Sequence, residues 1–435
     1  MSRISGLAMS PSPAVSEQVP YIHRGTRAFR NTNLALFAAG VATFGLIYCV
    51  QPLMPAFSHE YGVSAAASAL SLSLTTVVLA VGMLFAGALS DRWGRKPVMV
   101  ASILCSAVLV LISAATPDWH SFLIARTLLG LAVSGLPAVA MTYLSEEMDN
   151  ESIGLAMGLY ISGNAVGGLG GRIVAGVVAE FIGWHGGVAA VGLIGLISGL
   201  VFWRALPPSR HFRAGGASLR DLVRRFGVPF RDRGLPWMFI EGFLLLGAFV
   251  TVYNYLGYRL MAAPFNFSQA TVGLIFAIYL IGMFSSAWMG DLAGRLGRRR
   301  VFWTALVIML VGLALTLSDS VVLIFLGLGG VTFGFFGGHS IISSWVGRRA
   351  GATKAQASSL YLFAYYMGSS FCGAGGGLFY ASHGWNGVSA FVGILLGAAL
   401  VIGIGLKYLT PQGQQRRARP ERGHALRLAH SGNAG

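Results

Sequence analysis

The sequence predicts an all-α membrane protein, with twelve transmembrane helices arranged in two pseudo-symmetric six-helix bundles. Of its 435 residues, 55% are hydrophobic and only 11% are charged, a composition too apolar for a soluble fold. About 20 apolar residues are needed to cross a bilayer, and twelve segments of suitable length can be placed. A ten-residue motif that follows one apolar segment also returns in the second half of the chain, which indicates a duplicated unit.

The twelve segments divide the chain into two halves of six. They lie at about 33–55, 67–90, 97–116, 119–144, 153–181, 184–205, 236–260, 268–293, 300–318, 321–346, 354–381 and 384–407. We therefore expect a tail at 1–32, one bundle at 33–205, a linker at 206–235, a second bundle at 236–407 and a basic tail at 408–435. Residues 1–30 lack an apolar core, so no cleaved signal peptide is expected and the first segment is a retained anchor.

The linker contains one pattern typical of a surface helix. Ser218 and Asp221 resemble a capping box, and apolar residues follow at helical spacing with arginines between them. This predicts a short amphipathic helix lying on the inner leaflet. A disordered linker is the alternative, because Gly215, Gly216 and Pro229 limit helix length.

The distribution of basic residues predicts the topology. All but three of the 31 Lys and Arg residues fall in the two termini, the linker and alternate loops, or at the segment ends beside them. The positive-inside rule then places both termini and the linker in the cytoplasm of a bacterial-type inner membrane. The net charge of +16 thus reports topology, with the lipid bilayer as the partner and no nucleic acid. The three cysteines show no disulfide or metal pattern, and no cofactor is expected.

The duplication is visible in two places. The motif runs Gly87-Ala-Leu-Ser-Asp-Arg-Trp-Gly-Arg-Lys96 and returns 203 positions later as Gly290-Asp-Leu-Ala-Gly-Arg-Leu-Gly-Arg-Arg299. Segments five and eleven match at an offset of 201, for example at Gly183-Trp184 and Gly384-Trp385. Parallel repeats of this kind are a transporter architecture.

On these residues the chain resembles the major facilitator superfamily over essentially its whole length. Within it the chain looks most like the drug-efflux-like branch that includes the YnfM-type inner-membrane transport proteins. The family's loop motif, G-x-L-x-D-R-x-G-R-K, is met by the first copy, at Gly87, Leu89, Asp91, Arg92, Gly94, Arg95 and Lys96.

The resemblance implies a cytoplasmic latch that holds one access state. In the family the aspartate faces the start of helix eleven, which would place Asp91 near 355–358. The basic residues pair with acids at neighbouring helix ends, so Arg95 would meet Glu146 or Glu147. The predicted latch residues are Gly87, Asp91, Arg92, Gly94, Arg95, Lys96, Glu146 and Glu147. Gly294 replaces the aspartate in the second copy, so the latch should be carried by the first half.

Of two further family features, one is present in this sequence and the other is altered. The efflux-like branch has an arginine followed four residues later by glycine in segment four, matched by Arg126 and Gly130. Its antiporter signature, G-P-x-x-G-G, has Asn164 in place of the proline, which weakens the inference of antiport.

Charged residues within apolar segments need a physical reason. An isolated charge at the bilayer centre costs about 2.5 to 3.5 kcal/mol on insertion scales, so Arg126 and Arg172 are predicted to face a cavity, with snorkelling to the interface as the alternative. Glu241 and His339 are the proton-coupling candidates. Glu241 as an interfacial cap and His339 as a packing residue are the simpler alternatives.

Polar and aromatic residues on the pseudo-symmetric helices are predicted to line the passage, although tyrosines near helix ends also occur as interfacial belt residues. The predicted substrate cavity comprises Tyr48, Gln51, Arg126, Asn164, Arg172, Asn254, Tyr258, Tyr361 and Tyr365.

These observations predict a secondary transporter that works as a monomer and moves a small organic solute by alternating access, with proton-coupled efflux expected. An uptake symporter for a sugar or organic anion is the nearest alternative, and a non-transporting membrane sensor is another. A membrane enzyme is disfavoured because the sequence has no nucleotide-binding loop, no clustered set of His and carboxylate metal ligands, and no long reactive loop.

Overall fold

The computed structural model describes residues 20–212, 214–215 and 219–406, and within these ranges the chain is almost entirely helical. The prediction of an all-helical membrane protein is confirmed, since eight helical stretches of the described chain are long and apolar enough to cross a membrane. The helices of the first half are α1 (Arg27–Tyr48), α2 (Met54–Tyr61), α3 (Ala65–Trp93), α4 (Arg95–Ala114), α5 (Trp119–Val133), α6 (Gly135–Glu147) and α7 (Ile153–Ala205).

The linker and second half follow the same pattern. Their helices are α8 (Leu219–Gly227), α9 (Leu235–Met261), α10 (Gln269–Ile275), α11 (Tyr279–Leu296), α12 (Arg298–Leu315), α13 (Val321–Ala350) and α14 (Lys354–Gly405). Short 3₁₀ turns lie at Gln51–Leu53, Pro229–Arg231, Phe276–Ile278 and Gly351–Thr353. The helix α8 lies within the stretch predicted to be an amphipathic helix, whereas the proposed capping residue Ser218 lies outside the described residues.

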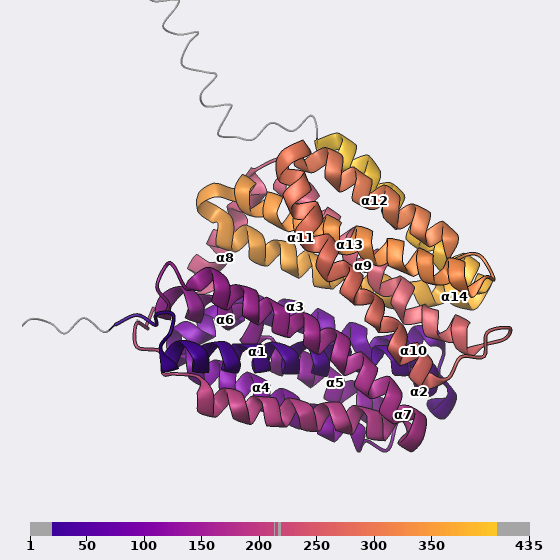
Figure 1. The fold of residues 1–435 in the computed structure, drawn as a ribbon, viewed down its shortest axis with the longest axis horizontal. Coiled ribbons are helices and arrows are strands. Elements are labelled where there is room, and N and C mark those ends of the chain that lie inside the picture. The colour runs from indigo at the N-terminus through magenta and orange to yellow at the C-terminus, as the bar shows by residue number, and fades with distance from the viewer. Residues whose placement is uncertain (1–19, 213, 216–218, 407–435) are drawn as a thin grey trace, which may run out of the picture.

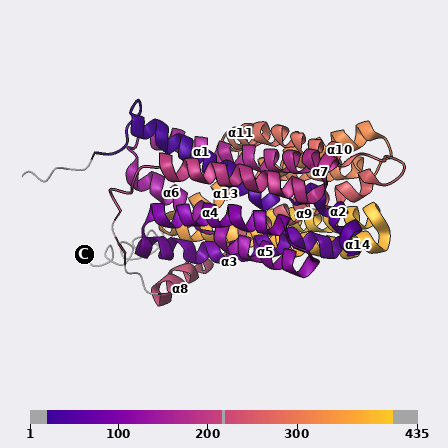
Figure 2. The same cartoon turned by 90° about the horizontal axis from the view of Figure 1, so that it is seen from below.

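The two halves form separate bundles. Figure 1 shows α1–α7 on one side and α9, α11, α12, α13 and α14 on the other, with α8 at one end between them. The view turned by 90° in Figure 2 shows the long helices running along the same axis, with the start of α1 and α8 at one end. Each bundle contains an equivalent helix pair, α1 with α7 and α9 with α14.

Glycines at equivalent positions terminate or bend the helices. Gly94 (φ 91°) separates α3 from α4, and Gly297 (φ 92°) separates α11 from α12, 203 positions later. The long helices α7 and α14 are each kinked at a glycine with positive φ, at Gly183 (76°) and Gly384 (56°). Because side chains disfavour this backbone conformation, the repeated glycines in the sequence correspond to repeated turns in the structure.

The glycine run of segment five packs helices within one bundle. A Cβ on Gly163 would lie 3.0 Å from the Cα of Phe37 on α1, and one on Gly171 would lie 2.5 Å from the Cα of Gly45. Small residues therefore let α1 and α7 pack closely.

The segment before α1 is held at the end of the molecule where α3 turns into α4. Ile22 pairs with Met148 as an isolated bridge, and the amide of Arg24 donates to the Ser152 hydroxyl at 3.1 Å. The Ser152 hydroxyl lowers the pKa of the Asp149 carboxyl by hydrogen bonding to it. The chain leading into the first bundle is thus tied to the loop between α6 and α7. This end, which also carries the linker, is called the basic end below.

Candidate functional site

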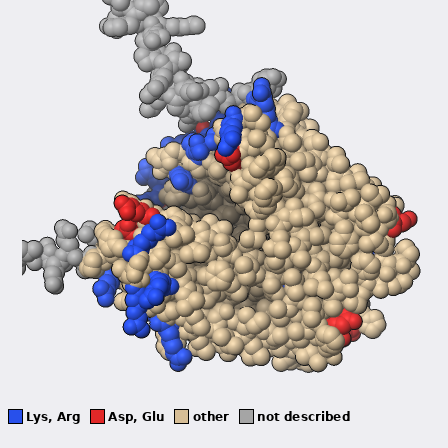
Figure 3. Space-filling view, viewed as in Figure 1, with Lys and Arg blue, Asp and Glu red and all other residues tan. Residues whose placement is uncertain are grey.

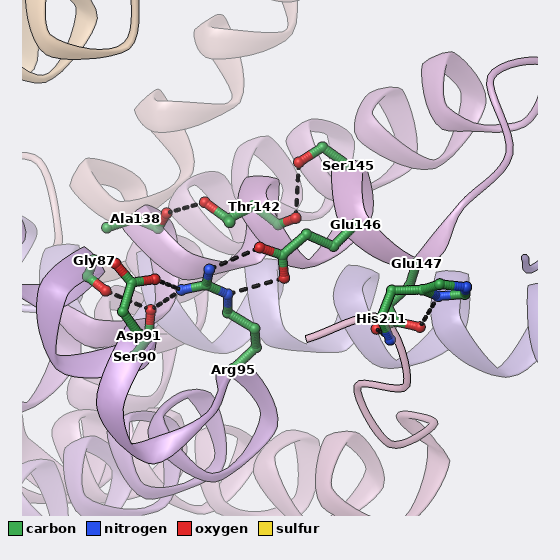
Figure 4. A network of polar contacts seen from close by, with 10 residues as sticks. All are labelled: Gly87, Ser90, Asp91, Arg95, Ala138, Thr142, Ser145, Glu146, Glu147 and His211. Carbon is green, nitrogen blue, oxygen red and sulfur yellow. Dashed lines mark hydrogen bonds and ion pairs between the residues drawn. The ribbon is translucent and has the colours of Figure 1, made fainter. Parts of the chain in front are cut away.

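The residues of the loop motif form a polar network at the basic end (Figure 4). Gly94 lets the chain turn so that Arg95, only 6% exposed, points back across the end of α3. Its guanidinium makes a bidentate contact with Glu146 on α6, with Nε at 3.0 Å and Nη2 at 2.7 Å from the two carboxylate oxygens. Paired, charge-assisted bonds of this kind fix both partners, so Arg95 joins α4 to α6.

The structure gives Asp91 a partner in its own bundle. Its carboxylate accepts a hydrogen bond from Arg95 Nη1 at 2.6 Å, and Ser90 accepts from the same nitrogen at 2.6 Å. In the described chain no hydrogen bond joins Asp91 to the start of α14, where the family resemblance had placed it. The carboxylate is instead held by Arg95, one helical turn further along the chain.

The other latch residues have distinct environments. Glu147, 2% exposed, accepts bonds from the amide and the Nδ1 of His211 in the linker, at 2.8 and 3.0 Å. Lys96 donates to the carbonyl of Leu206, whereas Arg92 is exposed. Arg95 therefore pairs with Glu146, whereas Glu147 pairs with His211 of the linker.

The second copy of the motif does not reproduce the network. Arg295 pairs with Asp291 at 2.9 Å, but the two side chains are 73% and 61% exposed. A solvent-exposed pair contributes little to stability. The buried ion pair of the second bundle is instead Arg349 with Asp232, at 2.6 Å. Sequence reasoning missed it, because Asp232 lies in the linker and no motif connects it to the end of α13.

Arg126 holds the end of α1 and does not face a cavity. It is 0% exposed, and its Nη1 and Nη2 donate to the carbonyls of Leu46 and Ile47 at 3.0 and 2.5 Å. These carbonyls belong to the last turn of α1, where no helical donor follows. Its Nε donates to the carbonyl of Ser71 on α3 at 3.0 Å. All three guanidinium nitrogens donate to backbone carbonyls. Arg126, which was predicted to line the cavity, therefore acts as a structural clip between helices.

Arg172 lies where the two bundles meet. It is 4% exposed, and its Nε donates to the Gln51 side-chain oxygen at 2.7 Å. Gln51 donates in turn to the side-chain oxygen of Asn254 on α9 at 2.8 Å. Three residues predicted to line the cavity thus form one buried chain of hydrogen bonds across the interface.

Aromatic rings from both bundles surround the Arg172 guanidinium. Its central carbon lies 4.3 Å from the ring centre of Tyr48 in the first bundle, and 5.0 and 4.9 Å from those of Phe276 and Tyr279 in the second. Cations at this distance from a ring are attracted by its π electrons. Sequence reasoning found Tyr48 but missed the two rings of the second bundle, which fall in an apolar stretch without a distinguishing pattern.

The remaining predicted residues occupy three separate places. Tyr361 and Tyr365 lie in the second bundle with His339, whose Nδ1 is 2.9 Å from the Tyr361 hydroxyl and whose ring centre is 4.6 Å from that of Tyr365. Tyr258 lies at the other end of the molecule, 2.6 Å from Ser58. Asn164 packs between α7 and α1, where a Cβ on Gly40 would lie 2.7 Å from its side-chain oxygen.

Glu241 is buried inside the second bundle and away from Arg172. It is 0% exposed, and neither carboxylate oxygen has a hydrogen-bond partner in the described chain. A Cβ on Gly403 of α14 would lie 3.6 Å from Glu241 Oε1 and 2.8 Å from Trp303 Nε1, so the two side chains approach the same point. The indole nitrogen of Trp303 is also unpaired.

Hydrogen bonds join the two bundles at the end opposite the basic end. Tyr258 donates to the carbonyl of Met54 at 2.8 Å, the Gln269 side chain donates to the carbonyl of Pro52 at 2.7 Å, and the amide of Ala270 donates to Glu180 at 3.0 Å. A Cβ on Gly176 would lie 2.7 Å from the Cα of Gly273. We call this set the closed gate; its residues are Pro52, Met54, Ser58, Gly176 and Glu180 of the first bundle and Tyr258, Gln269, Ala270 and Gly273 of the second.

The basic end is hollowed between the bundles. Figure 3 shows a depression there, bordered by Lys and Arg side chains and a few acidic ones. The described chain is therefore closed at one end and open at the other.

A separate groove of about 1050 Å³ lies on the first bundle, among α3, α4, α5 and α6. Its lining is almost wholly apolar and includes Phe85 and Trp93, which are 46% and 67% exposed. The lining includes neither Arg172 nor any ring that surrounds it, so we do not assign this groove to the solute.

Comparison with known proteins agrees with the fold and the repeat. The model of the Major Facilitator Superfamily matches residues 36–260 and 243–431. The chain is 49% identical over 390 residues to the inner membrane transport protein YnfM of Escherichia coli, covering 90% of this chain and 94% of that protein. It is 47% identical over 380 residues to YybF of Bacillus subtilis, described as an uncharacterized MFS-type transporter, covering 87% and 94%.

Solved structures show the same fold at low identity. A mutant of the nucleoside transporter NupG superposes with a TM-score of 0.71 at 17% identity, covering 87% of this chain and 99% of that one. A bacterial homologue of the lysosomal transporter Spinster, in an inward-facing and occupied conformation, gives 0.71 at 13% identity, covering 89% and 98%. The protein is a multi-pass inner-membrane transporter, and the chain belongs to the Major Facilitator Superfamily.

Proposed function

We propose that this protein exports a small organic solute in exchange for protons, by rocking of its two bundles about the Arg172 region. The observation that supports alternating access is the asymmetry between the closed gate and the hollow at the basic end. Rocking of two repeats about a fixed central site is the common mechanism of such folds. In this proposal the basic end faces the cytoplasm, both termini are cytoplasmic, and the conformation is open inward.

The proposal includes twelve crossings by one monomer. The kinks at Gly183 and Gly384 divide α7 and α14 into two spans each. The helix α12 carries three arginines at its start and would still cross with them at the cytoplasmic surface. Because the central site lies between bundles of the same chain, a single copy contains all the residues that the mechanism needs.

Glu241 is the proposed proton carrier. A buried carboxylate without a partner costs several kcal/mol when ionised, and Glu241 has no hydrogen-bond partner in the described chain. A side chain that binds a proton in one access state and releases it in the other would couple the gradient to rocking. His339, hydrogen-bonded to Tyr361, is the second candidate.

The test is accumulation of a solute driven by a proton gradient in everted membrane vesicles. Cells that overproduce the protein are first screened against a panel of toxic compounds and metabolites to find a solute. With that solute, we expect an imposed gradient, acidic inside the everted vesicle, to drive its accumulation, and Glu241→Gln to abolish the dependence on the gradient. Exposed Glu151→Gln is the control and should transport normally. Accumulation driven by the opposite gradient would instead indicate uptake symport, and binding without movement of any solute would indicate a sensor.

The loop motif is proposed to act as the cytoplasmic latch. Replacing Asp91 by Asn removes the charge that pairs with Arg95 Nη1 while keeping the shape of the side chain. We expect transport to fall about tenfold or more, because the lost interaction is a charge-assisted one of about 1.5 to 3 kcal/mol, with normal amounts of protein in the membrane. Asp291→Asn in the exposed second copy should have little effect. Equal activity of both variants would contradict the latch.

A further inference from the structure

The guanidinium of Arg172 is the one charge at the meeting of the bundles whose hydrogen-bonding capacity is incompletely used. Nε donates to Gln51 and Nη1 to the carbonyl of Gly168, at 2.7 and 2.5 Å. Neither partner is charged. In the described chain Nη2 has no hydrogen-bond partner, and no Asp or Glu forms an ion pair with Arg172.

The other two arginines inside apolar segments differ from Arg172 in this respect. Arg126 has a backbone carbonyl on each of its three nitrogens. Arg259 donates to the carbonyls of Thr316 and Ser318 and also lies 3.7 Å from Asp319. The hydrogen-bonding nitrogens of Arg126 are all used by the protein itself, and Arg259 has both carbonyl partners and a nearby carboxylate, whereas Arg172 keeps a free donor.

A buried arginine without a counter-ion is expensive to maintain. Arginine remains protonated in proteins, so Arg172, 4% exposed, carries its charge in the bundle interior. Charges at this depth pair with another group or mark a solute pathway. Because no acidic side chain of the described protein supplies the negative charge, a carboxylate on the solute is the group that fits, through charge-assisted bonds to the guanidinium.

The surroundings of the free donor are flat and aromatic. Tyr48, Phe276 and Tyr279 enclose the guanidinium, and the wall continues through the second bundle. Phe249 stacks on Phe335 at 3.8 Å between ring centres, and Tyr279 lies 5.3 Å from Phe249. Ring faces and edges arranged in this way favour another aromatic ring by offset or edge-to-face stacking.

We propose that Arg172 binds the carboxylate of an aromatic organic acid, with its ring against the wall formed by Tyr48, Phe249, Phe276, Tyr279 and Phe335. The inference rests on the proposed transport function, since it names the class of solute for that site. Arg172 is hydrogen-bonded to Gln51, and Gln51 is hydrogen-bonded to Asn254 in the other bundle. A carboxylate bound to Arg172 would therefore act on the interface between the bundles through these two side chains.

The test is binding by isothermal titration calorimetry, with the full chain in nanodiscs and empty nanodiscs subtracted. Three probes share a fused two-ring skeleton: 2-naphthoate, its neutral amide 2-naphthamide, and the saturated acid decahydronaphthalene-2-carboxylate. We expect 2-naphthoate to bind about tenfold or more tightly than the amide, since a charge-assisted bond exceeds about 1.4 kcal/mol. We expect it to bind about threefold or more tightly than the saturated acid, which keeps the charge but loses the ring contacts.

Two variants assign the binding to Arg172. Arg172→Gln should abolish the preference for 2-naphthoate over 2-naphthamide, and Arg172→Lys should weaken 2-naphthoate binding about tenfold, because lysine keeps the charge but loses the planar fork and the stacking. Both are checked for a single folded species by size-exclusion chromatography. Arg204→Gln, at the exposed end of the same helix, should bind like the parent protein.

The results separate this inference from the transport proposal. Equal binding of acid and amide, no binding of 2-naphthoate by the parent protein, or unchanged selectivity in Arg172→Gln would overturn the inference. If the vesicle experiment still shows proton-driven movement of another solute, transport stands while the solute class is wrong. Arg172-dependent binding of 2-naphthoate without movement of any solute would leave the site intact and overturn transport.

Discussion

Arg126→Leu is expected to destabilise the first bundle. The substitution removes the hydrogen bonds to the carbonyls of Leu46, Ile47 and Ser71 at a site that is 0% exposed. The Leu46 carbonyl keeps the Cys49 thiol as a donor and the Ser71 carbonyl keeps the Thr75 hydroxyl, whereas in the described chain the Ile47 carbonyl has no other donor. A buried acceptor left unpaired costs about 1 to 3 kcal/mol, and the end of α1 also loses the positive charge that favours a helix C-terminus. We expect the free energy of unfolding to fall by about 1 to 3 kcal/mol.

The measurement is equilibrium unfolding by a denaturant in detergent micelles. The fraction of folded protein is monitored at each denaturant concentration. Arg204→Leu is the matched control, since Arg204 is exposed, and its stability should change little. Arg172→Leu should lie between the two, because Arg172 donates to one carbonyl and one side-chain amide. If Arg126→Leu were as stable as the control, Arg126 would not be the clip that holds α1.

Gly176→Leu is expected to force the closed gate open and to stop transport. A Cβ at Gly176 would lie 2.7 Å from the Cα of Gly273 and 3.3 Å from the carbonyl oxygen of Gln269 in the other bundle. Backbone atoms at these distances cannot move aside locally, so the bundles must separate. Because the substitution lies at the gate and not in a bundle core, we expect folded protein that remains outside the gate-closed state.

Spin labels across the gate measure this shift. Labels at the exposed positions His59 and Ala262 are introduced in a Cys105→Ser background, since the other two cysteines are buried. We expect the distribution of distances between them to move to longer values in Gly176→Leu. Gly170→Leu on the same helix is the control, because a Cβ there meets nothing within 4 Å. An unchanged distribution with normal transport in Gly176→Leu would contradict the role of the closed gate.

Features encoded by local sequence were predictable. Gly94 and Gly297 are 203 positions apart, Gly183 and Gly384 are 201 positions apart, and all four adopt positive φ in the structure. Only glycine tolerates this backbone readily, so the repeat of the residue indicates the repeat of the turn. The apolar segments were predictable for a similar reason, since lipid requires long uninterrupted apolar helices.

Partners of the buried polar residues were not predictable to the same degree. Arg126 and Arg172 look alike in the sequence, as single arginines in apolar segments. Arg126 binds backbone carbonyls of Leu46 and Ile47, and a carbonyl has no signature in the sequence because every residue carries one. Asp91 was expected at the second bundle, but its partner depends on which end of the molecule is closed.

The sequence by itself determined the membrane environment, the two homologous halves and the positions of the turns, because these depend on composition, periodicity and the backbone freedom of individual glycines. Only the tertiary structure decided which arginine is a clip and which keeps a free donor, and which end of the two bundles is closed. These properties depend on distances between segments as far apart as Gln51 and Asn254, and such distances arise only when the helices pack.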